Sequence, residues 1–132
     1  MGRTKKKRRR RPAVQGRRKI SELVWGFAGD FIRMGDTPDE RQSLLNAACS
    51  AWNMACNPPE VRQRHLDSYM KEYLRHNRGA DKEEVDGVRD NMEKLIAQKL
   101  KLFPDDFRQI VGAQMVQTGG KDRIEVVSAR FD

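Results

Sequence analysis

Acidic residues are missing from the first 19 positions of this sequence, although those positions carry eleven lysines and arginines. The eleven cations are Arg3, Lys5, Lys6, Lys7, Arg8, Arg9, Arg10, Arg11, Arg17, Arg18 and Lys19. The rest of the chain holds sixteen basic and nineteen acidic residues, so it is mildly acidic although the whole chain has a net charge of +8. Because seven consecutive cations repel one another, we expect residues 1–18 to form a disordered polybasic tail. Residues 19–132 are then expected to fold as one domain, since their number suits a single core.

Long apolar runs are also missing. No stretch of this chain reaches the eighteen apolar residues that indicate a membrane-spanning helix. The basic start is not followed by the uninterrupted apolar segment of a signal peptide, and Lys6 stands where a myristoylation motif requires Ser or Thr. We therefore expect a cytoplasmic protein without integral membrane association.

Cysteine and histidine are scarce, with two residues of each. Cys49 and Cys56 lie on one predicted helix, about 10 Å apart along its axis, whereas a disulfide needs Cα atoms within about 7 Å. We expect two free, buried thiols. Together with His65 and His76 they match no common zinc-binding spacing, and no nucleophile elbow or glycine-rich phosphate loop is present. The sequence therefore indicates no catalytic residue, metal ligand, cofactor or small-molecule ligand, and we expect a protein that is not an enzyme.

Four segments show the apolar spacing of amphipathic helices. The first covers Ile20–Met34. The second and the fourth follow Thr37 and Asp81, each with a glutamate three positions later, which is typical of a capped helix start. The third follows Asn57 as its cap, with a proline at the first helical position, and Pro104 ends the fourth.

The last quarter of the chain changes character. Residues 107–117 and 123–130 are rich in β-forming side chains, and residues 118–122 between them contain two glycines. The sequence therefore predicts a mostly helical α+β fold, with about four helices followed by a C-terminal β-hairpin at about residues 107–131. Because an isolated hairpin is marginally stable, it must pack on the helices or pair its edge with another chain.

Aromatic residues make up only 7% of the chain. Trp25, Trp52, Tyr69 and Tyr73 stand at helical spacing on apolar faces, and we expect them to pack in the core. Asn53 follows Trp52 directly; it is either an internal hydrogen-bonding residue or a solvent-facing one.

The order of these features resembles that of small uncharacterised bacterial helical proteins that end in a β-hairpin. The resemblance rests on Trp52-Asn53-Met54-Ala55, on Pro58-Pro59-Glu60 and on Phe103-Pro104-Asp105-Asp106 ahead of the hairpin. It covers about residues 19–132 and implies the architecture, but no activity.

The polybasic tail gives the main functional prediction. Its cations suit contacts with phosphates, which carry no sequence information, and it contains no aromatic residue for base stacking. We predict a non-enzymatic accessory or interaction protein that binds nucleic acid non-specifically through the tail. Two alternatives stay open: a protein–protein adaptor or homodimer joined through the hairpin edge, with an incidental tail, and peripheral binding to anionic membranes.

Overall fold

The computed structural model describes residues 19–129. Within this range the elements follow the order α2 (Ile20–Ile32), α3 (Pro38–Ala55), α4 (Pro59–His76), α5 (Lys82–Leu102), β1 (Gln109–Thr118) and β2 (Lys121–Ala129). The predicted order of four helices and a C-terminal antiparallel hairpin is therefore confirmed. The predicted tail at residues 1–18 lies outside the described residues, as do residues 130–132.

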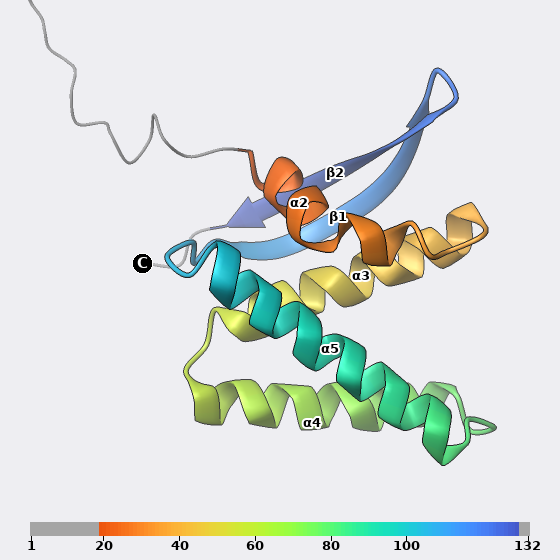
Figure 1. Ribbon diagram of the computed structural model, residues 1–132, viewed down its shortest axis with the longest axis vertical. Coiled ribbons are helices and arrows are strands. Elements are labelled where there is room, and N and C mark those ends of the chain that lie inside the picture. Colours follow the sequence, from red (N-terminus) through yellow and green to blue (C-terminus); the bar gives the residue numbers. More distant parts are fainter. Residues whose placement is uncertain (1–18, 130–132) are drawn as a thin grey trace, which may run out of the picture.

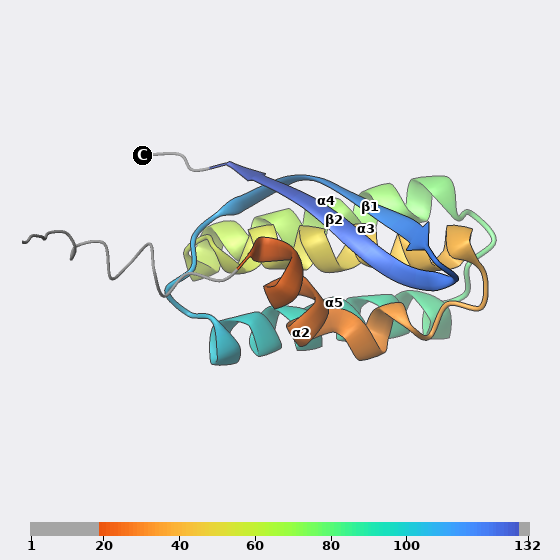
Figure 2. The same cartoon turned by 90° about the horizontal axis from the view of Figure 1, so that it is seen from above.

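Helix α3 is the centre of the arrangement (Figures 1 and 2). It contacts α2, α4, α5 and β1, while α4 contacts only α3 and α5 among the described elements. Small buried residues on α3, among them Ala48, Ala51 and Ala55, allow these neighbours to approach its backbone. As a result, the hairpin and α2 lie on one side of α3, and α4 lies at the opposite end of the molecule (Figure 1).

Two of the three predicted helix caps are present. Thr37 Oγ1 accepts a hydrogen bond from the Glu40 backbone N–H at 3.1 Å, and Asp81 Oδ1 accepts one from Glu84 at 2.8 Å. The Glu40 carboxylate in turn accepts a hydrogen bond from the backbone N–H of Asp36, and not from that of Thr37. Each cap satisfies a backbone donor that the first helical turn leaves without a partner.

The third predicted cap is wrong. Helix α4 begins one residue later, at Pro59, and its N-cap is Pro58, which has no side-chain oxygen to offer. Asn57 instead donates from its side chain to the Asn53 backbone oxygen at 3.0 Å, at the end of α3. The tandem prolines fix this start, because both have the φ value that a helix entrance requires.

The first helix ends at Ile32, two residues before the predicted end at Met34. The chain turns at Gly35 toward α3. A Cβ atom at this position would lie 2.8 Å from the backbone nitrogen of Arg41, so the close approach favours glycine. Arg41 also donates to the Gly35 carbonyl at 3.1 Å. Met34 is left 69% exposed beside this turn.

The hairpin is closed by a two-residue loop. Gly119 and Gly120 have φ values of +60° and +79°, and Thr118 pairs with Lys121 across them. Two consecutive positive φ values match the hairpin turn that favours glycine at both positions. At the other end of β1 the register shifts between Ile110 and Gly112, where Val111 forms a bulge and is exposed.

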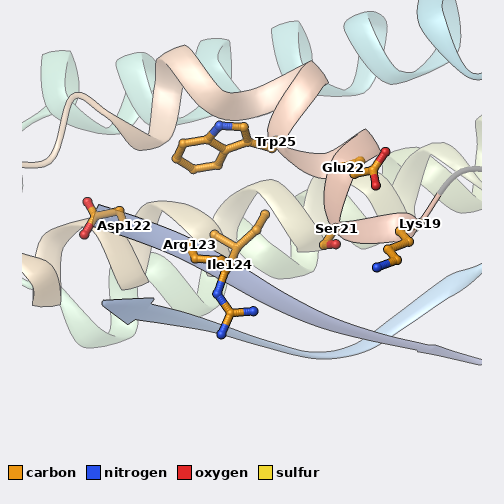
Figure 3. Close-up of a pocket in the computed structure, with 7 residues that line it drawn as sticks. All are labelled: Lys19, Ser21, Glu22, Trp25, Asp122, Arg123 and Ile124. Carbon is orange, nitrogen blue, oxygen red and sulfur yellow. The ribbon is translucent and has the colours of Figure 1, made fainter. Parts of the chain in front are cut away.

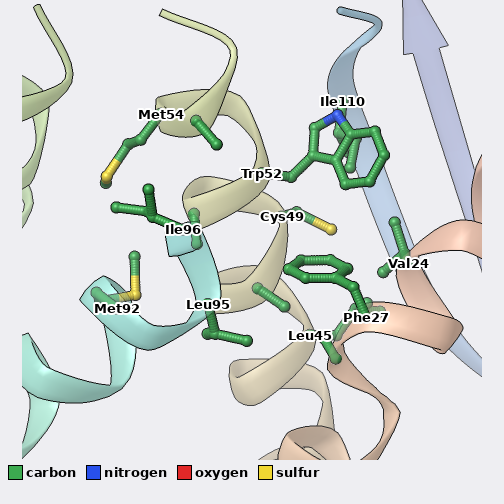
Figure 4. Close-up of a cluster of buried hydrophobic side chains, with 14 of the residues drawn as sticks. Val24, Phe27, Leu45, Cys49, Trp52, Met54, Met92, Leu95, Ile96 and Ile110 are labelled. Carbon is green, nitrogen blue, oxygen red and sulfur yellow. The ribbon is translucent and has the colours of Figure 1, made fainter. Parts of the chain in front are cut away.

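The core is centred on Trp52, which is fully buried as predicted (Figure 4). Its ring makes an edge contact with Phe27 at a centroid distance of 5.6 Å and a tilted contact with Phe103 at 6.0 Å. The indole Nε1 donates to the Arg108 backbone oxygen at 2.8 Å. The one polar atom of this side chain is therefore satisfied inside the core.

Candidate functional site

The predicted nucleic-acid site lies almost entirely outside the described residues. Ten of its eleven cations belong to residues 1–18, and only Lys19 is described. Lys19 is exposed and has an extended backbone at the N-cap of α2, where its carbonyl accepts from the Glu22 and Leu23 N–H groups. The polybasic segment therefore joins the fold at the first turn of α2.

Lys19 lines a groove between α2 and β2, with a volume of about 330 Å³ (Figure 3). The lining residues are Lys19, Ser21, Glu22, Trp25, Asp122, Arg123 and Ile124. Ile124 is buried in the core, whereas Lys19, Glu22, Asp122 and Arg123 are exposed. The two sides of this groove come from opposite ends of the sequence, and α2 packs directly on β2.

Trp25 packs against the core, as its helical spacing predicted, but it is only half-buried. Its indole extends from α2 toward β2 in Figure 3. The guanidinium carbon of Arg33, the C-cap residue of α2, lies 4.6 Å from the ring centroid of Trp25, which is a cation–π contact. The indole also lines the groove, and part of it is exposed there.

The charges that line the groove balance. Lys19 and Arg123 are offset by Glu22 and Asp122. Asp122 is already engaged, because its Oδ2 lies 2.8 Å from Arg41 Nε and its Oδ1 accepts from Gln117 at 3.1 Å. The Arg41 contact is an ion pair without hydrogen-bond alignment. The groove is therefore close to neutral, and its lining residues offer no strong attraction for a polyanion.

Arg123 is the cation that the tertiary structure adds to Lys19. It pairs with Glu125 at 3.2 Å, and both side chains are more than half exposed. An exposed pair of this kind contributes less than about 1 kcal/mol. The guanidinium can therefore exchange this partner for another one at little cost. No sequence pattern pointed to Arg123, because it lies in the second strand of the hairpin, about a hundred positions after the polybasic residues.

A second cavity of about 410 Å³ lies between the helices and has both polar and apolar walls. Its lining includes Phe31, Leu44, Tyr69, Tyr73 and Val88. The Tyr73 hydroxyl donates to Glu84 at 2.6 Å, and this hydrogen bond raises the pKa of Tyr73 to about 12. Burial raises the pKa of Tyr69. Both phenols are therefore protonated at neutral pH, and neither is prepared to act as a base.

Lys99 is a fully buried lysine on the apolar face of α5. Its Nζ donates to the Asp106 backbone oxygen and lies 4.8 Å from the ring centroid of Trp52. Burial lowers the pKa of Lys99, and the nearby Cys56 and Asp106 act in the opposite direction. The lysine ties the end of α5 to the loop that leads into β1. Its place in an apolar helical repeat was the sequence signal for this burial.

A buried ion pair completes the same loop. The guanidinium of Arg108 contacts the Asp106 carboxylate through two hydrogen bonds, at 3.0 Å from Nε and 2.6 Å from an Nη atom. Both side chains are only about one tenth exposed. Such two-point contacts fix geometry as well as charge. Together with Lys99 they hold the chain where β1 starts.

The four residues weighed as metal ligands or nucleophiles are not arranged for either role. His65 and His76 are exposed on α4, Cys49 is buried and Cys56 is half-buried. Burial raises the pKa of Cys49 to about 12 and also raises the pKa of Cys56, so both are thiols at neutral pH. Within residues 19–129, no three His, Cys, Asp or Glu side chains are grouped so that they could hold a metal ion.

Among the helices that the structure describes, none combines the length and the apolar character that crossing a membrane requires. No protein-family model, curated protein or solved structure matches this chain.

Proposed function

We propose that this protein is a non-enzymatic accessory protein that binds nucleic acids through residues 1–19, electrostatically and without sequence preference. One observation carries the proposal: eleven cations and no acid occupy nineteen positions, while the rest of the chain has an excess of three acids. A surface evolved only for solubility has no need to separate its charges so completely along the chain. The separation suits a partner whose charges are negative and closely spaced.

Counterion release supplies the affinity. Each phosphate that a cation neutralises releases condensed counterions, so log affinity falls linearly with log salt, with a slope near −0.9 per contact on duplex DNA and −0.7 on single strands. If most of residues 5–11 and part of residues 17–19 engage, the slope is about −5 to −8. Phosphate contacts do not distinguish bases, so DNA and RNA of unrelated sequence are expected to bind similarly.

The described residues support the proposal that the polybasic segment, and not the folded part, attracts the nucleic acid. Lys19 is exposed at the start of α2, so the polybasic segment enters the fold at the surface. The nearby groove is neutral, and the described residues as a whole do not add an excess of positive charge. We therefore expect the segment to supply the electrostatic attraction.

The test compares two charge-neutralised variants of the full chain in a salt-titrated anisotropy assay with labelled 20-mers of two unrelated sequences. In the first variant glutamine replaces all seven cations of residues 5–11. The matched control neutralises seven exposed cations of the helical region, namely Arg64, Lys71, Arg75, Arg78, Lys82, Lys94 and Lys101. The first variant is expected to lose measurable binding at about 150 mM salt. The control is expected to keep the affinity and the slope of the original chain.

Three results would contradict the proposal. Equal binding by the first variant would place the site on the folded domain. A strong preference for one of the two sequences would mean that side chains read bases. No binding by the original chain at low salt would remove nucleic acid as the partner.

The second candidate function is pairing of the hairpin edge with a protein partner or with a second copy of the chain. One observation limits which strand edge can pair. The edge of β1 is already occupied by two side-chain amides from α3. Asn53 donates to the Ile110 carbonyl and accepts from the Ile110 N–H, and Gln42 does the same with Ala113 and Met115. Edge pairing is therefore confined to β2. Light scattering at several concentrations measures it, and a strictly monomeric chain would exclude the homodimer.

Peripheral binding to an anionic membrane uses the same cations and remains the third candidate. Polybasic segments gain about 1 kcal/mol per cation near an anionic surface. Sedimentation with vesicles that contain phosphatidylserine, in competition with a nucleic-acid 20-mer, shows which of the two the chain binds more tightly. Preferential binding to vesicles would replace nucleic acid by the membrane surface.

A further inference from the structure

We infer that the groove between α2 and β2 receives a base of single-stranded nucleic acid, which stacks on Trp25 while residues 1–19 hold the phosphates. The inference depends on the proposed function and specifies the form of nucleic acid that is bound. The polybasic segment has no aromatic residue of its own, so on its own it cannot distinguish a single strand from a duplex by stacking.

The first support is the position of Trp25. It stands six residues after Lys19, about 9 Å along the axis of α2, and both residues line the same groove. The indole packs partly against the core and also lines the groove beside β2 (Figure 3). A strand held by the last cations of the segment therefore passes beside an accessible aromatic ring. The other tryptophan, Trp52, is fully buried and cannot be reached.

The second support is the electrostatic character of the groove. Its two acids balance its two cations, and Asp122 is already paired with Arg41. A neutral slot with an aromatic wall suits an uncharged base better than a phosphate. The Arg123 guanidinium points away from Trp25 in Figure 3, so it does not stack on the base. It can contact a neighbouring phosphate at the rim of the groove, because its pair with Glu125 is exposed and weak.

The third support is the state of the bases. In a duplex the bases are already stacked and paired, and moving one into a protein groove costs several kcal/mol. Bases of a single strand can leave the strand and stack on aromatic side chains without this cost. The same cations with an aromatic groove beside them should therefore favour single strands.

The experiment uses the full chain and compares a 20-mer of thymidine with a 20-base-pair duplex at one salt concentration. Base–aromatic stacking is worth about 1–3 kcal/mol per base. Trp25→Ala is therefore expected to weaken binding to the single strand roughly 5- to 150-fold and to leave duplex binding unchanged. Trp25→Phe should restore most of the affinity. The salt slope should stay the same in both variants, because stacking releases no counterions.

Phe107→Ala is the matched control. Phe107 is also an accessible aromatic residue, 61% exposed, but it lies in the loop before β1 and outside the groove. Its removal should not change the affinity for either nucleic acid. Fluorescence gives an independent readout: the single strand should quench the emission of Trp25, and the buried emission of Trp52 that remains in Trp25→Phe should be unaffected by binding.

The outcomes separate this inference from the proposed function. Unchanged single-strand affinity in Trp25→Ala, or no quenching on binding, overturns the inference while the polybasic segment still accounts for binding. Equal loss of single-strand and duplex affinity would also overturn it. If the original chain binds neither nucleic acid at low salt, the proposed function fails, and this inference fails with it.

Discussion

The two tryptophans of this chain stand on neighbouring helices, yet their surroundings differ. Trp52 on α3 is enclosed by Phe27, Phe103 and the aliphatic core, and its Nε1 is bonded to a backbone carbonyl. Trp25 on α2 is half-buried, carries the Arg33 guanidinium against its ring and borders a groove. Because both the ring and the Nε1 of Trp52 have their partners inside the fold, this residue stabilises the domain. Trp25 retains accessible ring surface.

The polar groups near the two tryptophans also differ: those near Trp52 form buried hydrogen bonds, and those near Trp25 form exposed ion pairs. Around Trp52, Asn53 exchanges two hydrogen bonds with the backbone of β1, and Lys99 bonds to the loop carbonyl of Asp106. Around Trp25, the ion pairs of Arg33 and Arg123 are exposed to solvent. Buried polar groups depend on their partners, whereas exposed pairs contribute little. Substitutions should therefore affect the free energy of unfolding near Trp52 and ligand binding near Trp25.

The largest effect is expected from Trp52→Ala. Removing a fully buried indole should lower the free energy of unfolding by about 3–5 kcal/mol, which is a large part of the stability of a domain this size. Urea denaturation followed by circular dichroism measures the loss. A change below about 1 kcal/mol would show that the indole is not packed as described. Trp52→Phe, which keeps most of the apolar volume, should cost less.

The next effect is that of Asn53→Ala, which leaves the N–H and the carbonyl of Ile110 without their side-chain partner. An unsatisfied buried backbone group costs about 1–3 kcal/mol, so we expect a loss within that range. Asn91→Ala, an amide on the exposed surface of α5, is the control and should stay within about 0.5 kcal/mol. Equal midpoints in urea for the two variants would mean that Asn53 does not anchor β1.

Alkaline pH should weaken the region around Trp52 through Cys49, which lies one helical turn before it. Burial raises the pKa of Cys49 from 9.0 to about 12. Above pH 9 the unfolded chain loses this proton first, so stability falls as pH rises toward 12, by at most about 1.4 kcal/mol per unit. Below pH 9 the thiol is neutral in both states and adds no pH dependence. Cys49→Ala lacks this contribution.

The measurement is the stability difference between the original chain and Cys49→Ala in urea at pH 8 and pH 10.5. The difference should shift by about 1–2 kcal/mol in favour of the variant at the higher pH. All other groups, including Lys99 with its lowered pKa, titrate in both proteins and cancel. A constant difference between the two pH values would show that the thiol is more accessible to solvent than its position indicates.

The smallest effect on stability is expected from Trp25→Ala. Because the residue is half-buried and its neighbouring ion pair is exposed, the loss should be about 1 kcal/mol or less. Thermal unfolding measures it. A loss as large as that of Trp52→Ala would remove the contrast between the two residues and make Trp25 a structural residue.

Local signals in the sequence were sufficient for most of the fold. Thr37 and Asp81 act within one helical turn, and Gly119-Gly120 close a loop of two residues, so neighbouring residues alone determine these features. The prediction failed where two local signals competed: Pro58 and Pro59 both suit the first helical position, and Pro59 occupies it, which leaves Asn57 outside the cap. For Trp25 it gave the face that packs against the core but not the extent of burial, because helical spacing shows which face a residue lies on and not how completely a neighbour covers it.

The sequence by itself determined the starts of α3 and α5, the hairpin turn and the separation of charge between residues 1–19 and the rest of the chain. Each depends on residues that are close together in the chain. Only the tertiary structure decided that β2 lies beside Lys19 and Trp25 along a groove, and that Asn53 covers the edge of β1 rather than facing solvent. These contacts join segments more than fifty residues apart. They follow from how α2 and the hairpin pack on α3, which no pattern of neighbouring residues encodes.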